Sequence, residues 1–183
     1  GIDGTGIKIA VIDTGVDFNH PDLFGWGPDG KVIGGYNFID ENELPMDTNG
    51  HGTKVAGIIA ADGGTLGVAH KAKILAYKVS EDGEGVSSEL IRKAIEKAIE
   101  DKADIINISL GVNKTNSKID SAVNHAWDNG IFVVTAAGND GPELKTIGSP
   151  GKNFESITVG ATYNNMTSSL IATLEIDENQ YTV

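Results

Sequence analysis

Three side chains with complementary chemistry lie next to segments whose residue types predict regular structure. Asp13 directly follows the apolar run 7–12, His51 opens a helical pattern, and Asn139 follows the apolar run 131–137. The carboxyl ends of parallel strands meet at one edge of a sheet, so we expect these groups to gather there. A carboxylate can fix the tautomer of a histidine, which then acts as a general base toward a hydroxyl. A side-chain amide can donate to a developing oxyanion, so the set suits acyl transfer.

The elements that must position these groups alternate between strands and helices. Apolar, β-branched runs predict strands at 7–12, 32–38, 73–79, 104–110, 131–137 and 156–161. Apolar residues at helical spacing predict helices at 51–61, 88–102 and 117–129. This order is typical of βαβ units, so we predict an α/β fold with a parallel sheet between helices. On the second helix, i,i+4 spacing predicts three ion pairs: Glu89 with Lys93, Arg92 with Glu96, and Lys97 with Asp101.

The composition excludes several classes of function. The chain has 183 residues and a formal net charge of −12, which argues against nucleic acid or an anionic membrane as the main partner. The absence of cysteine excludes disulfides, thiol catalysis and thiolate metal sites. No apolar run approaches the roughly 18 residues of a membrane helix, so we expect no membrane insertion. Because the first predicted strand begins almost at Gly1, we expect the chain to be part of a longer one.

Eight short motifs together resemble one protein family. Over about residues 4–162 the chain resembles the subtilisin-like serine proteases, the subtilases, because the motifs occur in the family's order. In this sequence they are Val11-Ile12-Asp13-Thr14-Gly15-Val16-Asp17, His20-Pro21-Asp22-Leu23, His51-Gly52-Thr53-Lys54-Val55-Ala56-Gly57, Leu66-Gly67-Val68-Ala69, Ser109-Leu110-Gly111, Ala136-Ala137-Gly138-Asn139, Ser149-Pro150-Gly151 and Ile157-Thr158-Val159-Gly160-Ala161. The resemblance implies a subtilisin-like three-layer α/β/α fold that is incomplete at the C-terminus.

The resemblance also assigns roles to residues of this chain. It implies that Asp13 is the orienting acid, His51 the general base and Asn139 the oxyanion donor. It places an extended polypeptide substrate between two backbone edges and beside a specificity pocket. One edge is Ser109, Leu110 and Gly111, the other includes Gly83 and Gly85, and the pocket is lined by Ala137, Gly138 and the stretch near 149–150. The implied activity is that of a serine endopeptidase working through an acyl-enzyme, in an extracellular or cell-surface location.

The sequence departs from the family in two places. Lys54 stands where family members commonly have a second histidine, outside the triad. More important, none of the serines lies in the family's G-T-S-M-A-x-P segment, which carries the nucleophile: they are Ser80, Ser87, Ser88, Ser109, Ser117, Ser121, Ser149, Ser156, Ser168 and Ser169. We therefore expect the chain to be inactive alone and to need the remaining C-terminal part of the catalytic domain as its partner. The alternative is a non-catalytic peptide-binding or scaffolding relative, a pseudo-protease.

The chain divides near residue 163. Residues 1–163 read as the N-terminal part of a subtilisin-like peptidase domain, and 164–183 as a junction followed by a β-rich inserted segment. The segment has two strand-like runs around a turn at 177–179, which is typical of a hairpin.

Other interpretations of the same residues stay open. Asp13-Thr14-Gly15 also matches an aspartic-protease triplet, but that chemistry needs a second carboxylate and a mostly β fold. The acidic and histidine side chains of residues 13–22 could form a metal cluster. In the family, the position of Asp22 can help to bind calcium, so Asp22 is a tentative calcium ligand although no cofactor is required. His51 could also be a satisfied core histidine.

Overall fold

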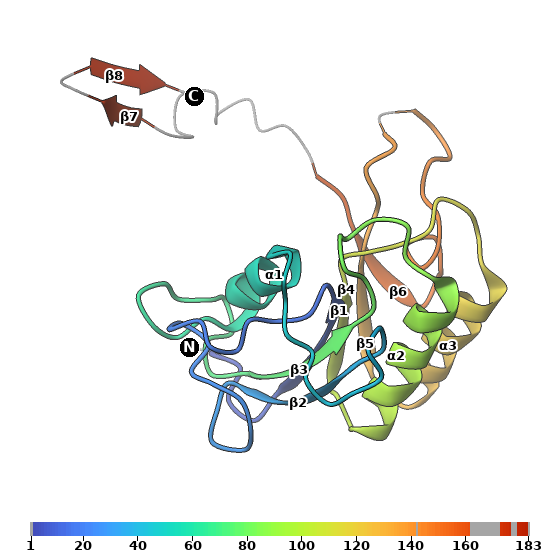
Figure 1. Cartoon of the computed structure of the whole chain (residues 1–183). Helices are drawn as coiled ribbons and strands as arrows, with labels where there is room; N and C mark the ends of the chain where they lie inside the picture. The colour runs from blue at the N-terminus through green and yellow to red at the C-terminus, as the bar shows by residue number, and fades with distance from the viewer. Residues whose placement is uncertain (1, 142, 162–172, 177–178, 183) are drawn as a thin grey trace.

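Six strands form one parallel sheet. The computed structural model describes residues 2–141, 143–161, 173–176 and 179–182, and its main sheet has the order β2-β3-β1-β4-β5-β6 (Figure 1). The strands are β1 (Lys8–Asp13), β2 (Val32–Asn37), β3 (Lys73–Lys78), β4 (Ile105–Ile108), β5 (Phe132–Ala136) and β6 (Ser156–Val159). All neighbouring strands of this sheet run parallel. The α/β prediction is confirmed, and each predicted strand is within two residues of the observed bounds.

Helices cover the sheet on both faces. They are α1 (His51–Ala60), α2 (Ser88–Glu100) and α3 (Ser117–Asp128). On one face, α2 and α3 pack side by side against the sheet, with Ile95 and Val123 in the same buried cluster as Ile106 (Figure 1). On the other face, α1 packs Ala56 against the side of the sheet that carries Val11. The molecule therefore has three layers, and two separate apolar clusters fix the sheet between them.

The ion pairs on α2 differ from the i,i+4 expectation. Among the described residues, only Lys97 and Asp101 form the expected pair. The planar guanidinium of Arg92 bonds both carboxylate oxygens of Glu89, three residues earlier, which it reaches with a forked geometry. Glu96 instead lies 2.9 Å from a ring nitrogen of His125 on α3. Packing of α3 beside α2 supplies this partner, which helical spacing alone does not reveal.

The strand order creates a natural binding position. β2 and β3 lie on one side of β1, and β4, β5 and β6 lie on the other. The chain therefore crosses from one side of β1 to the other between β3 and β4, which makes this place a topological switch point. Ligands of open α/β sheets bind outside the carboxyl ends of the strands at such a switch point. Asp13 is the last residue of β1 and pairs in register with Lys78, while Ser109 directly follows β4. The fold thus places the predicted acid at the switch point.

The C-terminal segment contributes a separate antiparallel pair. β7 (Thr173–Ile176) and β8 (Asn179–Thr182) pair with Leu174 opposite Tyr181. A hairpin is the structure that the sequence predicts here. The junction expected near residue 163 lies outside the described residues, so the inserted β-rich segment stays a prediction. Across the described part of the chain, no helix has the length and apolar character needed to cross a membrane.

Candidate active site

Asp13 and His51 meet at the carboxyl end of β1. Asp13 Oδ1 lies 2.7 Å from His51 Nδ1, although the residues are 38 positions apart in the sequence. The Asp13 side chain is fully buried, whereas that of His51 is 46% exposed. An ionised carboxylate can only accept hydrogen bonds, so Nδ1 carries the proton and Nε2 keeps its lone pair. The pair therefore presents a basic nitrogen on an oriented, accessible ring.

Asp13 is held in a specific orientation. Its Oδ1 also accepts a hydrogen bond of 2.7 Å from the backbone N–H of Thr14. Its Oδ2 is buried and has no partner among the described residues. A buried carboxylate with one unpaired oxygen is costly to remove from water. Among the described residues, the imidazole of His51 is the ionisable group bonded to this carboxylate, so it receives the stabilisation by the negative charge.

Gly52 allows this contact to form. A Cβ atom at position 52 would lie 2.1 Å from the carbonyl oxygen of Gly15 and 3.1 Å from Asp13 Oδ1. Any larger residue would push the first turn of α1 away from the end of β1. The glycine that follows His51 is therefore required by the close approach of the helix to Asp13.

A cleft opens beside His51. It has a volume of about 640 Å³, and His51 and Asn139 both line it. All the residues predicted to bind substrate line the same cleft: Ser109, Leu110, Gly111, Gly83, Gly85, Ala137 and Gly138. The structure therefore brings together groups from four loops that follow different elements. Asn49, Asp82, Glu84 and Asp140 also line the cleft, and sequence reasoning missed them as site residues.

Unpaired backbone groups border the cleft. In the described part of the chain, neither Gly85 nor Gly111 makes a backbone hydrogen bond, although both line the cleft. The backbone of the next residue, Val112, is already bonded to Ser149 O. Free N–H and C=O groups on a cleft wall can pair with an extended peptide.

The two serines of the cleft have other partners. Ser109 Oγ accepts a hydrogen bond of 2.9 Å from Asn107 Nδ2. Ser149 is buried, and its hydroxyl donates to Asp120 Oδ1 at 2.7 Å. Within the described ranges, no hydroxyl is hydrogen-bonded to the His51 ring, and the Asn139 side chain makes no hydrogen bond. The cleft thus holds a candidate base and a candidate amide donor without a serine in contact with the base.

The carboxylate of Asp22, the tentative calcium ligand, lies at the turn after α1. Its Oδ1 accepts a hydrogen bond of 2.7 Å from Gly64 N, and its Oδ2 accepts one of 3.3 Å from Thr65 N. Each oxygen keeps a further lone pair, so these bonds do not test the calcium role, which stays a prediction. Among the described residues, no three His, Asp or Glu side chains could together hold a metal ion. Asp22 fixes the turn after α1, and we derive no step through a metal.

The start of α1 is held by side chains that sequence reasoning missed. The N-cap residue is Gly50, which has no side chain to satisfy the first helical N–H groups. The N–H of His51 donates to Asn49 Oδ1, that of Gly52 to Thr14 Oγ1, and that of Thr53 to Asp47 Oδ2. An Asp and an Asn just before a helix are a capping signal, which could have identified Asp47 and Asn49 but not Thr14.

The pKa of Asp47 predicts how acid affects the fold. Burial raises the pKa of Asp47, but hydrogen bonds from Gly50, Thr53 and Asn49 outweigh this and hold it below its usual value. A lowered folded-state pKa stabilises the protein above the unfolded-state pKa of about 3.9, and this stabilisation is lost as the pH falls through the folded-state pKa. We therefore expect Asp47→Asn to lower the free energy of unfolding by about 1 to 3 kcal/mol at pH 7. The deficit should shrink as the pH falls below about 3.9, because Asp47 of the unfolded wild-type chain then takes up a proton before the folded protein does.

Urea unfolding at pH 7, 5 and 3 measures this effect. Asp128→Asn, a change on the exposed end of α3, is the matched control and should leave the curve nearly unchanged at each pH. An Asp47→Asn deficit that is as large at pH 3 as at pH 7 would contradict the assignment.

Comparison with known proteins identifies the family of the chain. The chain belongs to the subtilase family, whose sequence pattern matches residues 4–179. It is 42% identical over 176 residues to "Minor extracellular protease Vpr" of Bacillus subtilis (strain 168), which covers 88% of this chain and 21% of that protein. It is also 42% identical over 173 residues to "Major intracellular serine protease" of the same strain, with coverages of 88% and 52%.

A solved structure supports the same relationship. Sphericase matches with a TM-score of 0.72 and 36% sequence identity, over 98% of this chain and 58% of its own. The subtilisin-like fold is thereby confirmed. The chain spans between 21% and 58% of the lengths of these three proteins. One relative is named as extracellular and another as intracellular, so the likeness leaves both compartments open.

Proposed function

We propose that the protein is a serine endopeptidase that cleaves extended polypeptides through an acyl-enzyme. The observation that carries this proposal is the 2.7 Å contact between Asp13 and His51 beside an open cleft. Asp13 is the orienting acid, His51 the general base and Asn139 the oxyanion donor. Membership of the subtilase family supports these roles, because the motifs that carry the three residues resemble those of the family.

The proton movements follow from the geometry of the pair. His51 Nε2 takes the proton of the serine hydroxyl as the oxygen bonds to the substrate carbonyl carbon. The buried carboxylate of Asp13 stabilises the imidazolium that forms, and the Asn139 amide donates to the oxyanion. The tetrahedral intermediate collapses as the imidazolium gives its proton to the leaving amine. Water then enters, and His51 repeats the same exchange to release the acid product.

The nucleophile lies outside this chain, in the remaining part of the catalytic domain. The apolar surface supports such a partner. On α1 and the loop after it, Ile58, Leu66 and Val68 are exposed. On β5 and β6, Phe132, Ile157 and Val159 are also exposed. Exposed apolar side chains that gather on one surface are typical of an interface.

The substrate is held in extended form between residues 83–85 and 109–111. The unpaired backbone groups of Gly85 and Gly111 support this placement, because β-strand addition needs free main-chain donors and acceptors. We further propose an extracellular or cell-surface location, supported by the named compartment of Vpr. Secretion is tested by fractionating cells of the source organism and detecting the protein in the medium.

A fluorophosphonate probe, which modifies activated serines, tests the proposed function. The full-length protein is expected to be labelled, and the 183-residue chain alone is not. Labelling of the chain alone would show that it carries its own nucleophile. A full-length protein that is neither labelled nor able to cleave casein would be a pseudo-protease that binds peptides without hydrolysis.

A further inference from the structure

Asp47 connects the two segments that carry the acid–histidine pair. Its Oδ1 accepts a hydrogen bond of 2.9 Å from Thr14 Oγ1, and Thr14 directly follows Asp13. The same Oδ1 accepts from Asn49 N and Gly50 N at 2.9 Å each, at the residues that lead into α1. Its Oδ2 accepts from the backbone N–H and the hydroxyl of Thr53, one turn into the helix. One buried carboxylate thus bonds both the end of β1 and the start of α1.

Thr14 completes the connection between these segments. Its hydroxyl donates to Asp47 and accepts a hydrogen bond of 2.9 Å from Gly52 N. Its own N–H donates to Asp13 Oδ1, the atom that also contacts His51. Asp47, Thr14, Asp13 and His51 are therefore connected in this order by hydrogen bonds.

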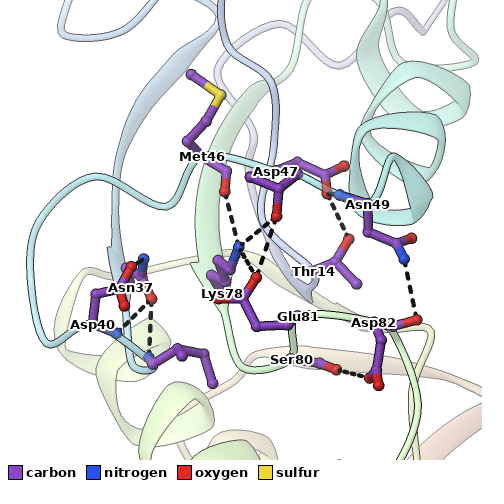
Figure 2. A network of polar contacts seen from close by, with 12 residues as sticks. Thr14, Asn37, Asp40, Met46, Asp47, Asn49, Lys78, Ser80, Glu81 and Asp82 are labelled. Atoms are coloured by element: carbon purple, nitrogen blue, oxygen red, sulfur yellow. Dashed lines mark hydrogen bonds and ion pairs between the residues drawn. The ribbon is translucent and has the colours of Figure 1, made fainter.

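Asp47 is itself fixed from the opposite side. The side chain of Lys78, which is buried at the end of β3, donates to Met46 O at 3.2 Å (Figure 2). It also donates to Thr48 Oγ1 at 3.3 Å, so it bonds the residues on both sides of Asp47. Lys78 also pairs with Glu81 at 2.9 Å. Asn49 Nδ2 donates to Asp82 O, which ties the same segment to the loop that borders the cleft (Figure 2). Asp47 therefore has little freedom to follow a displaced helix.

The backbones of the two connected segments are also closely packed. A Cβ atom at Gly15 would lie 2.5 Å from Pro45 O and 3.0 Å from Asp47 N. Val16 N donates to Pro45 O at 2.9 Å. The loop after β1 and the segment before α1 are thus in backbone contact, and the carboxylate of Asp47 bonds both.

We propose that Asp47 is a positioning residue that sets the register between β1 and α1 and so keeps His51 Nδ1 on Asp13. The proposal rests on the proposed function for its catalytic consequence. Without the carboxylate, the N–H groups of Gly50 and Thr53 lose their acceptor, and Thr14 loses the partner that orients it. The first turn of α1 then shifts relative to Asp13. A shift near 1 Å can reduce turnover by about a hundredfold even when substrate binding is unaffected.

Kinetics of the full-length protein on a peptide p-nitroanilide test the catalytic consequence. Asp47→Asn is expected to lower kcat by about 10-fold to 100-fold with KM within about twofold. Thr14→Val, which removes the bridging hydroxyl, should lower kcat in the same way, and Thr14→Ser should restore most of the loss. The control is Asp101→Asn. Asp101 bonds Tyr77 and Lys97 far from the cleft, so its loss reduces stability while kcat stays within about twofold.

Proton NMR of the same variants tests the positioning itself. The proton that bridges His51 Nδ1 and Asp13 gives a signal downfield of the amides, assigned by its absence from His51→Ala. It is expected to weaken or vanish in Asp47→Asn and Thr14→Val and to persist in Asp101→Asn. An unchanged signal in Asp47→Asn overturns the proposal, whatever the variant's stability or kcat. If the wild-type protein hydrolyses no peptide, the proposed function fails while this NMR comparison still decides the role of Asp47.

Discussion

Replacing His51 with alanine is expected to abolish peptide hydrolysis by the full-length protein. The variant loses the imidazole ring, which contacts Asp13 through one nitrogen and lines the cleft. In subtilisin, where the effect on kcat has been measured, loss of the catalytic histidine lowers kcat by about 10⁶-fold. We expect a loss of at least about 10⁴-fold here, measured as kcat on a peptide p-nitroanilide at pH 8.

The fold of the His51→Ala variant should survive. The backbone N–H at position 51 keeps its bond to Asn49 Oδ1, and the lost ring is half-exposed. Leaving Asp13 with one donor costs about 1 to 3 kcal/mol, which thermal unfolding can detect. His125→Ala is the matched control, because it removes an exposed histidine on α3 and should leave kcat within about twofold. Hydrolysis by His51→Ala at the wild-type rate would reject His51 as the base.

The elements of this fold were predictable because their local patterns agree with their surroundings. The sequence of β4 is a nearly continuous apolar run, which is typical of a strand that is covered on both faces of the sheet. Ile106 and Ile108 of this strand are fully buried. The apolar stripe of α2 places Ile91 and Ile95 at i,i+4 spacing, and both are buried. The errors fell at element ends and on charged pairs. Neighbouring elements decide those features, as the contact between Glu96 and His125 shows.

The acid and base of the site could be located from short motifs, but the long-range contacts of their supporting residues could not. Asp13 and His51 stand in local contexts that family resemblance identifies. Asp47 lies four positions before His51 and bonds Thr14 across 33 positions, a contact that spacing along the chain does not reveal. The same holds for Lys78, whose burial beside Met46 and Thr48 depends on how a strand end meets a loop. Tertiary contacts of this kind carry no local signal.

Asn139→Ala is expected to lower turnover strongly while leaving binding and stability nearly unchanged. Its amide lines the cleft beside the strand end of β5 and has no partner among the described residues. A donor that bonds the substrate oxygen mainly when it becomes an oxyanion acts in the transition state. Its loss therefore lowers kcat and changes KM little. Loss of such a donor in subtilisin, the relative in which it was measured, costs about 10² to 10³ in kcat, and we expect the same range here.

Two further substitutions separate an oxyanion donor from a general polar contact. Asn113→Ala removes another exposed side chain that lines the cleft and should change kcat by less than about tenfold. Asn139→Asp keeps the shape of the side chain but replaces the donor with an acceptor of negative charge. Because that charge repels an oxyanion, kcat should fall at least as far as in Asn139→Ala. Equal activity of Asn139→Asp and wild type would mean that the oxyanion is stabilised elsewhere, and the unpaired amide of Asn139 would then serve only to shape the cleft.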